Sequence, residues 1–444
     1  MDPVEVAALG VLVVVFASVS MRIERWPISM PMVFTGAGLV ASATGMVDIS
    51  ADEAAIALLA EVTLAVILFS DAVRIDLRRL RVHLGIPARL LGIGLPLTIV
   101  IGTIANSLLF PDLSLVHVAL LAAILAPTDA ALGAAVVESE GVPLRERLAL
   151  NVESGVNDGL VVPVVAILTA AVIDEGRSTV GWIGFVAQQL GWGIGLGVVL
   201  GGGAIALLRW THERGWADAR FEQLATFVVP IVALFAAEAL SGNSFIAAFV
   251  AGLTFGSFGR PASLPENDSE PALSERLDAF TEDAAQLLAI GAFFVFGNVL
   301  LSEALDAITI TVVLCAIATL TVARMVPVWL SLIGTQLPLT SRLFVGWFGP
   351  RGLASIVFGL LLLEESELGA EVGEQLFAVI ALTVAASILL HGATAAPAAE
   401  AYTRWSRREE RSAAGTDSEM DHDMEMAVPR TRWSRRPGRR PDPS

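Results

Sequence analysis

Acidic side chains stand inside two of the most apolar stretches of this 444-residue chain. The first stretch carries Asp129, which follows Pro127 and Thr128. The second stretch carries Glu153 and Asp158. An ionisable side chain inside a membrane costs at least about 2.5 to 3.5 kcal/mol, so a chain keeps such a residue for a function. The chemistry that these acids indicate is the binding of cations and protons.

The spacing of the polar residues in the second stretch separates its two carboxylates. Residues four apart share a face of a helix, so Glu153 lies with Asn157, and Ser154 lies with Asp158. Glu153 and Asp158 are five apart and diverge by about 140° around the helix axis. The two carboxylates are therefore expected to have different functions.

Asp158 is the acid with suitable companions for a small cation. Ser154, together with Thr128 and Asp129, would supply the hard oxygen atoms that Na⁺ or Li⁺ prefers, by analogy with other hard cations. Burial disfavours the ionised form of a carboxylate, so protons and metal ions would compete for Asp158 near neutral pH, which is an exchange mechanism. We expect an ion- and proton-binding site of Asp158, Asp129, Thr128, Ser154 and Asn157, with Asp158, Ser154 and Thr128 as the ligands of Na⁺.

Proline is expected to interrupt two of the helices. Pro127 breaks the helix before Asp129, and the motif Gly349-Pro350-Arg351-Gly352 breaks a later one. Broken helices expose partial charges at their ends within the membrane, and Asp129 and Arg351 have the right signs to neutralise them. The alternative is a pair of ordinary proline kinks.

Arg324, in another apolar stretch, is the expected ionic partner of Glu153. An unpaired buried acid or arginine would be costly, so the two residues would form a structural ion bridge. The alternative for Arg324 is a side chain that reaches to the membrane surface from the cytoplasmic end of its helix.

The elements that must position these residues are membrane-spanning helices. Hydrophobic residues make up 55% of the sequence, and its mean hydropathy is +0.70. Apolar stretches of about 20 residues, each long enough to cross the ~30 Å hydrocarbon core of a bilayer, recur from end to end. The fold class is therefore an all-α polytopic membrane protein. About thirteen spans are expected, at residues 4–20, 28–46, 54–73, 85–107, 115–137, 147–172, 180–208, 223–240, 244–258, 280–301, 307–331, 342–363 and 373–396.

The distribution of arginine orients these spans. Arginines gather in alternate loops, and Arg177 is the exception on the opposite side, so the N-terminus is expected outside and the C-terminus in the cytoplasm. An odd number of spans allows two inverted six-span repeats, at about 1–172 and 223–396, around a linking helix at 180–208. The broken helices then occupy matching positions, the fifth and the twelfth spans, and would cross at the ion site.

The polar segments are expected to be solvated. Residues 260–283 would form a hydrophilic connector, and residues 402–444 a disordered cytoplasmic tail that follows a transmembrane domain at 1–401. A net charge of −17 and the lack of lysine do not support nucleic-acid binding through a basic surface. Cys315 is the single cysteine, which leaves no disulfide framework and no cysteine metal site.

Taken together, the motifs resemble Na⁺/H⁺ antiporters of the NhaP type, which are monovalent cation/proton antiporters related to animal sodium/proton exchangers. The resemblance covers residues 1–400. It rests on motifs that occur in the order of the family: Ala126-Pro127-Thr128-Asp129, Glu153-Ser154 with Asn157-Asp158, Phe245-Ile246-Ala247-Ala248-Phe249-Val250-Ala251-Gly252-Leu253, Arg324, and Gly349-Pro350-Arg351-Gly352.

The resemblance implies a thirteen-span homodimer in which a core domain moves against a dimerisation domain in an elevator-like cycle. It implies that Asp158 binds the ion and the proton and that Glu153 bridges to Arg324. An Asn-Asp pair marks the members of the family that resemble electroneutral antiporters. One departure is Asp71, where the family usually places Glu followed by Gly, so Asp71 is either an accessory residue or a cap of its helix.

The expected function is secondary active exchange of Na⁺ or Li⁺ for H⁺ across the cell membrane, for pH and Na⁺ homeostasis. The protein would not be an enzyme and would need no cofactor. A K⁺/H⁺ antiporter is an alternative, as is a cation channel or symporter that uses the same acids. An intramembrane aspartyl protease is disfavoured because the Tyr-Asp and Gly-x-Gly-Asp signatures are missing.

Overall fold

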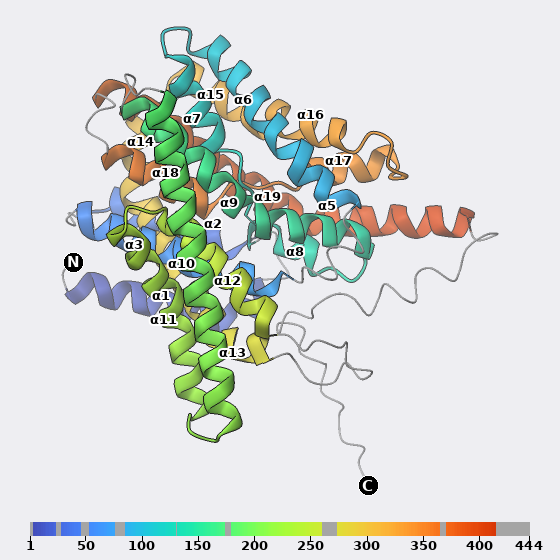
Figure 1. Cartoon of the computed structure of the whole chain (residues 1–444). Coiled ribbons are helices and arrows are strands. Elements are labelled where there is room, and N and C mark those ends of the chain that lie inside the picture. The colour runs from blue at the N-terminus through green and yellow to red at the C-terminus, as the bar shows by residue number, and fades with distance from the viewer. Residues whose placement is uncertain are drawn as a thin grey trace.

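Helices account for all the regular structure in the part of the chain that the computed structural model describes, namely residues 3–23, 28–45, 53–75, 85–129, 131–173, 179–259, 273–364 and 370–413 (Figure 1). The elements are α1 (Pro3–Ile23), α2 (Met30–Ala43), α3 (Glu53–Arg74), α5 (Gly85–Arg89), η1 (Leu90–Gly94), α6 (Leu95–Leu109), α7 (Leu115–Ile124), η2 (Ala131–Gly133), α8 (Ala134–Val137), α9 (Leu144–Ile173), α10 (Thr179–Glu213), α11 (Ala219–Ala239), α12 (Ser244–Gly259), α13 (Leu273–Val295), η3 (Phe296–Leu300), α14 (Leu301–Asp306), α15 (Ile310–Leu320), α16 (Val322–Ser331), α17 (Leu339–Trp347), α18 (Leu353–Glu364) and α19 (Ala370–Ala413).

The helices agree with the spans expected from hydropathy. Within the described residues, eight helices are long and apolar enough to cross a membrane, and five apolar helices are shorter, with 10 to 17 residues. Each of the thirteen expected spans overlaps one of these long or short apolar helices. The prediction of an all-α polytopic membrane protein is therefore confirmed.

Helix α3 lies at the centre of the packing. It contacts α9, α11, α12, α13 and α18. Glycine allows its closest contact, because a Cβ atom at Gly252 or Gly256 of α12 would overlap the backbone of α3 at Phe69 or Val73. Small residues let the backbones of membrane helices approach in this way.

The fifth and twelfth spans are both interrupted, as their prolines predict. Helix α7 ends at Ile124, and the chain is non-helical from Ala126 to Asp129 before η2 and α8. Helix α17 ends at Trp347, and α18 begins at Leu353 after a second non-helical segment. We call residues 125–129 the first break and residues 348–352 the second break.

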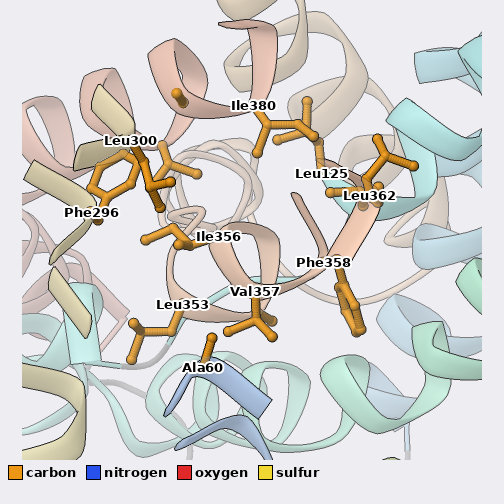
Figure 2. Packing of buried hydrophobic residues seen from close by; sticks show 14 of the residues in the cluster. Ala60, Leu125, Phe296, Leu300, Leu353, Ile356, Val357, Phe358, Leu362 and Ile380 are labelled. Atoms are coloured by element: carbon orange, nitrogen blue, oxygen red, sulfur yellow. The ribbon is translucent and has the colours of Figure 1, made fainter. Parts of the chain in front are cut away.

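Helix α18 follows the second break and is buried on all sides. Leu353, Ile356, Val357 and Phe358 each expose at most a few per cent of their surface. Figure 2 shows these side chains pointing in different directions, among neighbours such as Ile380 from α19. A helix that is apolar all round is held inside a protein or a membrane, so α18 fixes the position of the second break.

Two expectations about polar segments are wrong for the part of each segment that the structure describes. Helix α19 continues to Ala413, so residues 402–413 are helical, and residues 414–444 lie outside the described part of the chain. The cause is packing: the Tyr402 ring stacks on Phe344 with centroids 4.0 Å apart, and its hydroxyl lies 2.9 Å from a Glu146 oxygen. Helix α13 likewise begins at Leu273, within the segment 260–283 that was expected to be a solvated connector.

Candidate functional site

The two breaks lie against each other and are joined through their backbones. The Asp129 N–H donates to the Pro350 carbonyl at 2.8 Å. In return, Nη1 of Arg351 donates to the carbonyls of Ala126 and of Pro127, the latter at 3.0 Å. Residues more than 200 positions apart in the sequence are thus joined at one point, where both helices are interrupted.

Charged side chains meet the exposed ends of the broken helices. The Leu353 N–H, at the N-terminus of α18, donates to Oδ2 of Asp129 at 3.1 Å. A helix N-terminus carries partial positive charge, so the Asp129 carboxylate stabilises it. Arg351 donates to carbonyls just beyond the C-terminus of α7, where the partial charge is negative. A Cβ at Gly352 would overlap the Asp129 carboxylate, so this contact requires a glycine there.

Hydroxyl and amide groups gather between the first break and α9. The hydroxyl oxygens of Thr128 and Ser154 are 3.0 Å apart, and the Asn157 side-chain amide donates to Thr128 Oγ1 at 2.6 Å. All three residues are buried. Helix α9 presents Ser154 and Asn157 to the break because they are three positions apart, which places them on neighbouring faces.

Asp158 lies on the same helix and has an unsatisfied oxygen. Its residue exposure is 9%, and its Oδ1 atom is buried without a hydrogen-bond partner. Oδ1 of Asn157 is buried and unsatisfied in the same way. A buried acceptor without a donor costs about 1 to 3 kcal/mol, and more if it is charged, so this position favours a bound proton or cation.

The oxygen donors fit a monovalent cation better than a transition metal. No group of three or more His, Cys, Asp or Glu side chains arranged to hold a metal ion occurs among the residues described by the structure. Asp158, Ser154 and Thr128 offer one carboxylate and two hydroxyls, which are hard ligands with a single formal charge.

Glu153 and Arg324 form a buried ion pair. Nη2 of Arg324 donates to Oε2 of Glu153 at 2.9 Å, and Nη1 contacts Oε1. The two residues expose 4% and 3% of their surface, respectively, so Arg324 does not reach to the membrane surface. A Cβ at Gly349 would overlap the guanidinium, so the second break also leaves room for this pair.

Asp71 is partly buried in the last turn of α3. Its charge is close enough to interact with those of Asp129 and Asp158. The structure thus places Asp71 beside the site, on a helix that contacts both α9 and α18.

Side chains of helix α19 also bind the second break, and the sequence did not predict this contact. Ser387 accepts a hydrogen bond from the Arg351 N–H at 2.7 Å. His391 contacts the Trp347 carbonyl through Nε2 at 2.9 Å and stacks on the Trp347 ring. In the sequence, Ser387 and His391 are recognisable as two polar residues four positions apart in an apolar helix. That spacing does not predict that they bind Arg351 and Trp347.

Comparisons with known proteins agree with this arrangement. Residues 10–401 match the family model described as sodium/hydrogen exchanger, transmembrane. The chain is 26% identical over 425 residues to the K⁺/H⁺ antiporter NhaP of Alkalimonas amylolytica, covering 94% of this chain and 69% of that relative. It is 27% identical over 350 residues to the Na⁺/H⁺ antiporter NhaP of Pseudomonas aeruginosa, covering 75% of this chain and 78% of that relative.

A solved structure has the same fold. The sodium proton antiporter MjNhaP1 from Methanocaldococcus jannaschii at pH 8 superposes with a TM-score of 0.70 and 18% identity. The superposition covers 87% of this chain and 98% of MjNhaP1. The family match spans most of the sequence, including both breaks and α9, and the chain therefore belongs to the sodium/hydrogen exchanger family of multi-pass membrane proteins.

Proposed function

We propose that the protein is a secondary active antiporter that exchanges a monovalent cation for protons across the cell membrane. The observation that carries this proposal is the unsatisfied Oδ1 atom of the buried Asp158, which follows Asn157 on α9, the residue whose amide donates to Thr128 in the first break. A transporter of this kind needs one acid that binds either ion. Family membership and the fold support the same function.

In this proposal, Asp158 holds a proton or a cation but not both. The hydroxyls of Thr128 and Ser154 complete the cation's coordination, and Asn157 orients Thr128 through their hydrogen bond. When the cation leaves, a proton takes its place, because an empty carboxylate in a buried position is disfavoured. In this mechanism the site moves from one side of the membrane to the other only with a cation or a proton bound. Each cation carried in one direction is therefore exchanged for a proton carried in the other.

Na⁺ or Li⁺ is our proposed cargo, because one carboxylate and two hydroxyls are a compact set of hard oxygens. K⁺ is the second candidate, since a relative covered over 94% of this chain is named as a K⁺/H⁺ antiporter. This chain spans 69% of that relative's length.

Alternating access would come from movement of one group of helices against another. We propose an elevator-like cycle in which the breaks and α9 move as a unit, because they are tied together by Arg351, Asp129 and the Glu153–Arg324 pair. We also propose a homodimer, inverted repeats at about 1–172 and 223–396, an external N-terminus and a role in pH and Na⁺ homeostasis. The arginine-rich loops support this orientation.

The test is proton movement in sealed vesicles that contain the purified protein and an internal pH dye. An outward or inward gradient of NaCl, LiCl or KCl, against choline chloride, should drive proton flux in the opposite direction. Asp158→Asn vesicles serve as the control. A cation flux that needs no opposing proton movement would instead identify a channel, and cation and proton flux in the same direction a symporter.

A further inference from the structure

A second group of polar residues, of which three are buried and two partly exposed, lies between α3 and α13. Ser70 and Arg74 come from α3, and Asp278, Thr281 and Glu282 come from α13. The Ser70 hydroxyl donates to Oδ2 of Asp278 at 3.0 Å. We call these five residues the α3–α13 cluster.

The charges in the α3–α13 cluster do not balance. Arg74 lies 2.7 Å from a Glu282 oxygen through Nη2 but 3.8 Å from Asp278 through Nε. Glu282 is thus the nearer of these two acids to Arg74, and Asp71 adds a further acid close enough to interact with Asp278. Asp278 itself is only 3% exposed, so water does little to stabilise its charge.

Two oxygen atoms of the cluster have no donor. Oδ1 of Asp278 and Oγ1 of Thr281 are both buried without a hydrogen-bond partner. The two residues are three positions apart on α13, so they share a face of that helix. Because Ser70 contacts the other Asp278 oxygen, this face is turned toward α3. Buried polar atoms without partners in a native protein often mark the place of a ligand.

We propose that Asp278, Thr281 and Ser70 form a second binding site for a monovalent cation. One aspartate, one threonine and one serine repeat the composition of Asp158, Thr128 and Ser154, and all of their ligand atoms are hard oxygens. Ser70 precedes Asp71 directly on α3, and α3 contacts both α13 and α9, the helix that carries Asp158. The second site is then a station that the cation occupies on its way to Asp158, a role that rests on the proposed antiport.

The experiment measures cation binding without transport. The melting temperature of purified Asp158→Asn protein in detergent is followed while NaCl, LiCl or KCl replaces choline chloride at constant ionic strength and pH. We expect a saturable rise that persists in Asp158→Asn and is lost in the double variant Asp158→Asn/Asp278→Asn. The matched control is Asp158→Asn/Asp283→Asn, which makes the same charge change at an exposed position of α13 and should keep the rise.

Other variants keep the test decisive if Asp278→Asn does not fold. Thr281→Val conserves shape and charge, and in the Asp158→Asn background it should raise the half-saturating cation concentration. The proposal is overturned if Asp158→Asn shows no saturable rise, or if Thr281→Val and Asp278→Asn leave the rise unchanged. A melting temperature that responds to pH but not to the cation would also overturn it, because the cluster would then bind only protons. Failure of wild-type exchange in vesicles would leave these binding results intact, so the two proposals fail separately.

Discussion

Two carboxylates on α9 occupy opposite kinds of environment, although only five positions separate them. Glu153 is bound at both oxygens by Arg324, which also donates to backbone carbonyls of α17. Asp158 has a buried oxygen with no partner. Both residues are at least nine-tenths buried, so exposure does not distinguish them.

The difference shows how one helix can carry a structural acid and a functional acid together. A carboxylate that is bidentate to arginine is stabilised as an ion, and each of its oxygens already has a charged donor. A buried carboxylate with an oxygen that lacks a hydrogen-bond donor is destabilised until it binds a proton or a cation. We therefore expect changes at Glu153 to reduce stability and changes at Asp158 to reduce transport.

The largest expected effect on transport is that of Asp158→Asn. The amide cannot release a proton and is a weaker cation ligand, so exchange in vesicles should be abolished while the protein stays folded in the membrane. Asp306→Asn makes the same change at an exposed position and should exchange at the wild-type rate. Folded Asp158→Asn protein that still exchanges cations at close to the wild-type rate would remove Asp158 from the mechanism.

The largest expected effect on stability comes from breaking the Glu153–Arg324 pair. Glu153→Gln or Arg324→Met leaves one buried charge alone and should lower the free energy of unfolding by about 3 to 5 kcal/mol. The double variant should cost less than the sum, because it removes both charges. Melts in detergent measure all three, with Glu140→Gln as an exposed control. Strictly additive effects would contradict the pairing.

A smaller loss is expected from Gly352→Ala. The new Cβ would overlap the Asp129 carboxylate and displace it from the Leu353 N–H. Loss of a charge-assisted hydrogen bond costs about 1.5 to 3 kcal/mol, which corresponds to roughly a 10- to 100-fold slower exchange if the site depends on it. Gly203→Ala is the control, because nothing lies within 4 Å of the added methyl group. Equal exchange rates for the two variants would show that Asp129 tolerates displacement.

Thr128→Ala and Ser154→Ala should each have a still smaller effect. Each removes one neutral hydroxyl, worth about 1 kcal/mol, so the apparent KM for the cation should rise roughly five-fold. Thr103→Ala is a matched control, since the Thr103 hydroxyl bonds to its own helix at Ile99. An unchanged KM in both site variants would mean that the hydroxyls do not bind the cation.

The contrast between Glu153 and Asp158 could be predicted from the sequence because it depends on local geometry. The helical period separates the two residues, and Arg324, 171 positions from Glu153, is selected as its partner because it is an arginine within an apolar stretch. The two breaks could also be predicted from the sequence, because proline and glycine alter the backbone of the segment in which they stand.

Contacts that depend on tertiary packing were not predictable in this way. Ser387 and His391 form hydrogen bonds at the second break only because α19 packs against it. Asp278 was assigned to a solvated connector because its neighbours in the sequence are polar, yet α13 buries it against α3. Tyr402 extends α19 beyond the expected boundary through contacts with Phe344 and Glu146. The composition of a segment therefore does not determine whether its residues are buried, because burial depends on the helices that pack against it.

The smallest expected effect is that of membrane potential on exchange, which should be nil. If one cation replaces one proton at Asp158, no net charge moves in a cycle. Asn157 precedes Asp158 and cannot carry charge, and its amide is engaged by Thr128. Glu153 is engaged in an ion pair with Arg324.

Whether exchange is independent of membrane potential depends on Asp129, because a second proton carried by Asp129 would make the cycle move net charge. We expect it to remain ionised, since the Leu353 N–H at the N-terminus of α18 donates to its carboxylate. The measurement is Na⁺-driven proton movement in sealed vesicles with the potential clamped at different values by a K⁺ gradient and valinomycin. A rate that changes systematically with potential would contradict exchange through Asp158 alone. In that case Asp129→Asn should restore a rate independent of potential if Asp129 is the second proton carrier, and should leave the dependence in place if the carrier is Glu153.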